Sequence, residues 1–174
     1  MTPEFSRPLR LDQIGAGDHK QSIEADKAER AALARRFELI SVDRIHADYA
    51  VRRDAAGVLA TGRLTGAVVQ ACVATGAPVP ATIDEPFTLR FLPEPGDDAP
   101  EEVELGEADC DTMFYTGSAI DLGEAAAETL ALALDPFPRA RGADAALRDA
   151  GVVGEEEAQP LSGLAAALKE KLGK

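Results

Sequence analysis

The sequence has few aromatic residues: no tryptophan, two tyrosines and six phenylalanines among 174 residues. Its core therefore has to be built from Leu, Val, Ile and Ala, with a few phenylalanines as large anchors. Hydrophobic residues still make up 45 % of the chain, which excludes a wholly disordered protein. The length suits one domain. We expect the anchors to be Phe87, Phe91, Phe114 and Phe137.

Cysteine is also scarce, and the sequence lacks long apolar runs. Two cysteines, Cys72 and Cys110, cannot make the disulfide framework that stabilises small secreted domains. The first residues, MTPEFSRPLRLDQIG, lack the apolar stretch of a secretory signal. No run approaches the roughly 20 apolar residues that span a bilayer. We therefore expect a cytoplasmic protein with no membrane partner.

Positive charge is the third deficit. Lys and Arg total 18 against 31 Asp and Glu, which gives a formal net charge of −13. Proteins bind nucleic-acid backbones through Lys and Arg, so this balance disfavours broad, direct contact with RNA. Two explanations of the acidity remain open: a basic protein partner, or a surface that is charged for solubility alone.

The apolar pattern predicts an α+β fold with an antiparallel sheet flanked by helices. Alternation with a period of two, and apolar stretches between turn signals, mark the strands. We expect strands over 5–11, 20–25, 45–51, 58–73, 82–92 and 112–119. Gly62 and Gly66 predict a bulge or bend in the fourth of them, and hence a sheet that curls toward a barrel.

Helix signals and charge runs divide the chain further. Asp26 and Glu29 form a capping-box pattern, which predicts a helix over 26–36. Nine acids and no Lys or Arg lie between Glu94 and Asp111, so we expect an acidic flexible loop over 93–111. One domain is expected over 1–140. A polar connector and a short amphipathic helix with leucines at helical spacing are expected over 141–174.

The segment 120–139, IDLGEAAAETLALALDPFPR, carries the sharpest local signal. Asp121 and Glu124 predict a capped helix start, and the two prolines of DPFPR predict an abrupt stop near residue 134. The stop presents an aromatic side chain and an arginine, which suits partner binding as well as plain helix termination. The candidate interaction residues are Asp121, Leu122, Asp135, Pro136, Phe137, Pro138 and Arg139, together with Cys72.

The sequence offers no complete catalytic, metal or cofactor site, and no small-molecule substrate is evident. His19 and His46 lie apart in the sequence, and Cys72 has no second cysteine nearby. A thiol- or metal-dependent enzyme that pairs Cys72 with a histidine stays open as a minor alternative. A second alternative is direct RNA binding through a local basic face made by Arg30, Arg35, Arg36, Arg52 and Arg53.

Three segments, taken in order, resemble the YceD family, the large ribosomal RNA subunit accumulation proteins (DUF177). They are GRLTGAVVQACVA at 62–74, the block at 120–139, and PLSGLAAALK at 160–169. Many relatives carry Cys-x-x-Cys where this chain has Cys72 and Thr75, which weakens any metal or redox function. The resemblance implies a non-enzymatic factor in ribosome biogenesis that supports accumulation or processing of large-subunit (23S) rRNA. Its expected partners are basic ribosomal or ribosome-assembly proteins, with rRNA itself as the alternative.

Overall fold

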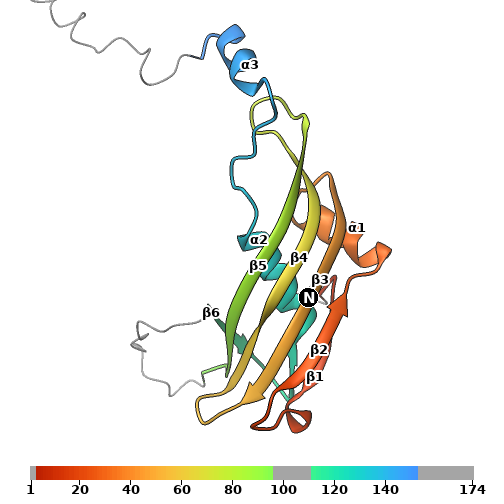
Figure 1. Cartoon of the computed structure of the whole chain (residues 1–174), viewed down its shortest axis with the longest axis vertical. Helices are drawn as coiled ribbons and strands as arrows, with labels where there is room; N and C mark the ends of the chain where they lie inside the picture. The colour runs from red at the N-terminus through yellow and green to blue at the C-terminus, as the bar shows by residue number, and fades with distance from the viewer. Residues whose placement is uncertain (1–2, 96–110, 153–174) are drawn as a thin grey trace, which may run out of the picture.

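The computed structural model describes residues 3–95 and 111–152, and it has the predicted α+β architecture (Figure 1). The predicted acidic loop lies almost entirely outside these residues, as does the predicted C-terminal helix. The elements in chain order are β1 (Pro8–Arg10), the 3-10 turn η1 (Leu11–Gln13), β2 (His19–Glu24), α1 (Lys27–Arg36), β3 (Ser41–Arg53), β4 (Val58–Ala71), β5 (Pro78–Pro93), β6 (Asp111–Tyr115), β7 (Ala119–Asp121), α2 (Leu122–Leu132) and α3 (Ala143–Asp149).

The main sheet has the order β2-β3-β4-β5-β6 and is open. Strands β2 to β5 form the predicted antiparallel meander, but β6 pairs parallel to β5, with Leu89 opposite Asp111. The predicted α+β fold with a sheet flanked by helices is confirmed, but β6 makes the sheet mixed, and the sheet is not closed into a barrel. A parallel neighbour needs a connection of a dozen or more residues, and residues 94–110 supply that length where a short turn could not.

A second, two-stranded sheet pairs β1 with β7, the strand that leads into α2. Leu9 lies opposite Ile120, so the N-terminal segment is held beside the start of α2. Helix α2 packs against β3 and β4, while α1 packs beside β3 (Figure 1). Helix α3 lies within the stretch expected to be a polar connector, beyond the end of the sheet. Within the described ranges, no helix is long and apolar enough to cross a membrane.

The two strand glycines serve packing and do not interrupt β4. Pairing continues without a shift through Gly62 and Gly66 on both sides of the strand; the register shift lies in β3, between Val42 and Arg44. A Cβ atom on Gly62 would stand 1.9 Å from the Asp48 carbonyl oxygen. On Gly66 it would press against Leu130 of α2 at 3.2 Å. No bulge therefore lies at these glycines, and Gly66 leaves room for the helix.

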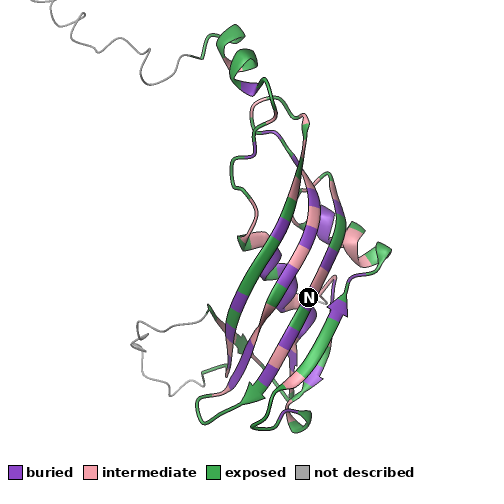
Figure 2. Ribbon diagram, in the orientation of Figure 1, coloured by how far each residue is buried: buried purple, intermediate pink, exposed green. Residues whose placement is uncertain are grey.

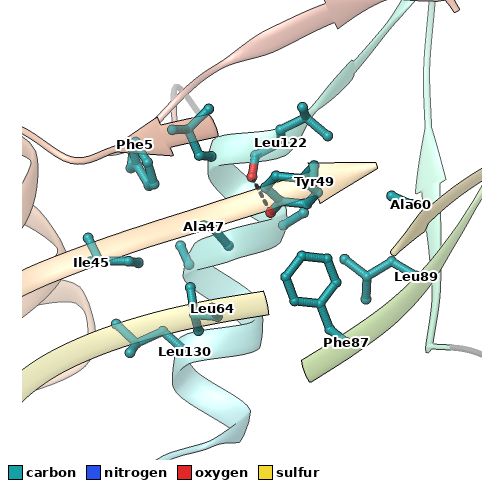
Figure 3. Close-up of a cluster of buried hydrophobic side chains, with 14 of the residues drawn as sticks. Phe5, Ile45, Ala47, Tyr49, Ala60, Leu64, Phe87, Leu89, Leu122 and Leu130 are labelled. Carbon is teal, nitrogen blue, oxygen red and sulfur yellow. Dashed lines mark hydrogen bonds between the residues drawn. The ribbon is translucent and has the colours of Figure 1, made fainter. Parts of the chain in front are cut away.

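The core lies between the sheet and α2, where buried and exposed residues alternate along the strands (Figure 2). Tyr49 and Phe87 pack with ring centroids 4.9 Å apart, and the Tyr49 hydroxyl donates to the Leu122 carbonyl oxygen at 2.8 Å (Figure 3). Apolar burial at such positions supplies the main stabilisation. The largest fully buried side chains are Phe5, Leu33, Ile45, Leu64, Ile120, Leu122, Leu130, Val51, Val58 and Val68.

Half of the predicted aromatic anchors are core residues. Phe87 and Phe91 are buried as expected. Phe114 is 60 % exposed because it lies on the outward side of the edge strand β6, and Phe137 is 71 % exposed. The expectation that Phe137 packs back on the core is therefore wrong. Phe5, which the sequence pattern did not single out, is fully buried instead.

Candidate interaction site at the end of β4

Asp121, the predicted helix cap, fixes the start of α2 and the N-terminal segment together. Its carboxylate accepts hydrogen bonds from the backbone N–H groups of Gly123 (2.9 Å) and Glu124 (3.2 Å). The same carboxylate accepts from the Arg7 N–H at 2.8 Å and from the Ser6 hydroxyl. Asp121 thus satisfies helix-end donors from α2 and donors from a segment more than 100 residues away.

The rest of the capping-box prediction at this helix is not met. The Glu124 carboxylate turns away from the cap and binds the Arg36 guanidinium at 2.7 and 2.9 Å. Leu122, a second candidate interaction residue, is buried in the core. The structure therefore places Asp121 and Leu122 inside the framework that positions α2.

The exit segment, Asp135–Arg139, is fastened to the end of β4. Gln70 Nε2 donates to the Asp135 carbonyl oxygen at 2.8 Å, and the Val73 N–H donates to the Pro138 carbonyl oxygen at 2.9 Å. Pro138 is buried. In Figure 1 the chain after α2 runs beside the β4–β5 hairpin before it reaches α3. Two backbone attachments therefore hold a segment that has no regular secondary structure of its own.

Fastening the segment leaves Phe137 in solvent. The Asp135 carboxylate accepts from the Phe137 N–H at 2.9 Å, which fixes the local turn. Phe137 is 71 % exposed. Val73, whose backbone N–H bonds to Pro138, is 54 % exposed. Pro136, the residue before Phe137, is also exposed. We call Val73, Pro136 and Phe137 the apolar tip.

Arg139 does not extend the apolar tip as a free cation. Its guanidinium lies 3.0 Å from the Asp144 carboxylate on α3, and both side chains are exposed. An exposed pair of this kind contributes little to stability, so Arg139 can exchange this partner for another at small cost.

Cys72 directly follows Ala71, the last residue of β4, and lies two residues after Gln70. Its side chain is only 3 % exposed. The pKa of the thiol is lowered to about 7, first by the Ala140 N–H and then by the Thr75 hydroxyl, since both donate to the sulfur. Thr75 stands where many relatives are expected to have a second cysteine, and here it serves as a donor to Cys72.

The structure does not bring a histidine to Cys72. His46 lies opposite Thr65 on β4, roughly 20 Å of strand from Cys72, and its ring contacts the Ser22 hydroxyl at 3.0 Å. His19 lies farther along, opposite Val51. Cys110 is outside the described residues. Over 3–95 and 111–152, no group of three His, Cys, Asp or Glu residues could hold a metal ion.

The arginines proposed as a basic RNA-binding face also lie apart. Arg36 is held between Glu124 and Glu4, the latter at 3.1 Å. Arg52 and Arg53 stand at the far end of β3, whose 13 residues extend over about 40 Å away from the end of α1. Arg52 lies 3.8 Å from the Asp18 carboxylate. These arginines therefore form no single cationic surface.

Sequence reasoning missed Gln70 as a member of this site. A polar side chain at an inward position two residues before Cys72 is the signal that could have found it. Its Nε2 holds the exit segment, whereas its Oε1 is buried without a hydrogen-bond partner among the described residues. A buried oxygen without a partner costs stability.

The fold and the site define an α+β protein with an open mixed sheet and a helix exit fastened at one end of it. A family model described as "Large ribosomal RNA subunit accumulation protein YceD" matches residues 60–170, more than half of the chain, so the chain belongs to the YceD family. The match begins in β4 and includes α2, the exit segment and α3. No curated protein and no solved structure matches the chain.

Proposed function

We propose that this protein is a non-enzymatic ribosome-biogenesis factor, which supports accumulation of large-subunit rRNA by binding a basic protein partner through the apolar tip. Family membership supports the rRNA role, since the family description names that process. The observation that carries the contact surface is Phe137, an aromatic side chain that is 71 % exposed on a backbone bonded to β4.

The apolar tip has the properties of a protein-binding anchor. Aromatic side chains at the centre of an interface contribute much of the binding energy. Fixing the backbone in advance lowers the entropy lost on association, and Pro136, Pro138 and the bond from Val73 do so here. Val73, whose N–H bonds to the Pro138 carbonyl oxygen, adds exposed aliphatic surface where the exit segment is attached. The exit segment thus presents a preorganised patch to a partner.

The charge distribution favours a protein partner over bare RNA. Several arginines are already engaged by carboxylates of this chain: Arg7 by Glu29, Arg36 by Glu124, and Arg90 by Asp54. The net charge of −13 leaves an excess of carboxylates. Such a surface repels phosphate and attracts the basic surfaces typical of proteins that bind rRNA.

The test is complementation of a deletion strain, with the ratio of large- to small-subunit rRNA as the readout. The wild-type gene should restore the ratio, and Phe137→Ser should fail to restore it. Phe114→Ser is the matched control, because Phe114 is a similarly exposed phenylalanine on β6. Affinity capture should recover basic ribosomal or assembly proteins with wild type and with Phe114→Ser. Full restoration by Phe137→Ser would remove the apolar tip from the mechanism.

A further inference from the structure

A groove of about 480 Å³ lies between α2 and the β5–β6 end of the sheet. Helix α2 packs on β3 and β4, so in the described chain the face of β5 and β6 beside it is left partly open. Phe87 and Met113 contribute apolar surface to the groove, and Leu132 stands at its margin, 78 % exposed. A leucine so exposed on a helix with seven buried residues is apolar surface available to a ligand.

The polar lining of the groove has a single sign of charge. Glu85, Asp111 and Glu128 contribute carboxylates, and the lining contains no Lys or Arg among the described residues. The pKa of Glu128 is raised, first by partial burial and then by the nearby Glu124 carboxylate. A cation placed among these groups would offset both effects.

The groove also adjoins the exit segment. Leu132 and Ala133 line it at the end of α2, and Asp135 follows two residues later. The groove therefore reaches the end of α2 from which the exit segment leaves.

We propose that this groove binds a lysine- or arginine-bearing segment of the protein partner, with an apolar side chain against Met113 and Leu132 and cations at Glu85 and Glu128. The inference rests on the proposed function, because it assigns a second contact to the same basic partner. Apolar surface edged by carboxylates complements a basic, amphipathic peptide and repels a phosphate backbone. The occupant is therefore a protein segment and not RNA.

The test uses the full chain and fluorescent 15-residue peptides tiled across the large-subunit ribosomal proteins of the same organism, read by polarisation at low salt. Peptides that contain both cations and apolar residues should bind. The double variant Glu85→Gln/Glu128→Gln should weaken binding roughly tenfold, since it removes two opposite-charge contacts. Glu38→Gln/Asp149→Asn removes the same charge from exposed sites elsewhere and should change affinity less than about twofold.

A second pair of variants tests the apolar contact. Leu132→Ser should weaken the same peptides about fivefold, and Val152→Ser, which removes an exposed aliphatic side chain on the far side of α3, should leave affinity unchanged. Equal losses from the groove and control variants would overturn the inference, because binding would then follow net acidity alone. Absence of peptide binding would also overturn the inference. The complementation test with Phe137→Ser does not depend on the groove, so it tests the proposed function separately.

A photo-crosslinking residue in place of Leu132 identifies the occupant directly. A crosslink to the bound peptide supports the proposal. A crosslink to residues 160–172 of the same chain, or to a second copy of the chain, would overturn it in favour of a self-contact. Sedimentation of the crosslinked product separates these two self-contacts by mass.

Discussion

Helices α1 and α2 begin alike and end in different environments. Asp26 caps α1 by accepting from Ala28 and Glu29, and Glu29 returns a bond to the Asp26 N–H at 2.7 Å. Asp121 caps α2 by accepting from two N–H groups in the same way. Yet α1 buries only Leu33 and Ala34, whereas seven of the eleven residues of α2 are buried.

The comparison shows that the cap residues and the composition of a helix control different properties. The caps determine where each helix begins, because they satisfy the first free N–H groups. The composition decides where each helix packs. The sequence KAERAALARR keeps α1 beside β3, with many charged residues outside the core, while LGEAAAETLAL lets α2 lie on the sheet. Small alanines on α2 allow close packing, and Gly66 provides the facing space.

The largest expected effect breaks the packing of α2. Leu130→Ala should lower the free energy of unfolding by about 3 kcal/mol, because it leaves a cavity where Leu130 meets the sheet. Leu33→Ala in α1 should cost less, about 2 kcal/mol, since a helix beside the sheet relaxes more readily. Urea denaturation measures both, with Leu132→Ala as an exposed control at under about 0.5 kcal/mol. An equal or larger loss at Leu33 would contradict the difference between the helices.

The next effect sharpens the comparison of the two caps. Asp121 accepts two helix-end bonds and two further bonds from Arg7 and Ser6, so Asp121→Ala should cost about 2–3 kcal/mol. Asp26→Ala loses helix-end bonds only and should cost about 1 kcal/mol. Hydrogen exchange should show lost protection over 8–10 in the first variant alone. Equal costs, with β1 still protected, would mean that Asp121 acts only as a cap.

Local signals in the sequence were sufficient for the meander, both caps and the position of the helix stop. They were insufficient for contacts between distant segments. The pairing of β1 with β7 and the parallel β6 depend on where the chain returns after long connections, which no local period encodes. The sequence pattern made Phe137 a candidate residue, but its exposure follows from bonds made by Gln70 and Val73, which only the assembled sheet brings to the exit segment.

The smallest expected effect is on the pH dependence of stability, compared for one carboxylate in each helix. Arg7 holds both oxygens of Glu29 at 2.6 and 2.9 Å, which lowers the pKa of Glu29 below its usual 4.5. Glu29 therefore stabilises the fold above that pH, and its contribution is lost as the pH falls through the lower folded pKa.

The pKa of Glu128 shifts in the opposite direction, because partial burial raises it. Its charge opposes folding at neutral pH, and the opposition fades as the pH falls through the raised pKa. We expect Glu29→Gln to be less stable than wild type at pH 7, and the difference to shrink as the pH falls through the lowered pKa of Glu29. We expect Glu128→Gln to be slightly more stable at pH 7, by a margin that solvent screening keeps small, and equal to wild type below pH 4. Urea titrations at several pH values measure both differences. If both variants changed the stability in the same direction at pH 7, the carboxylates of Glu29 and Glu128 would not lie in the different environments inferred for α1 and α2.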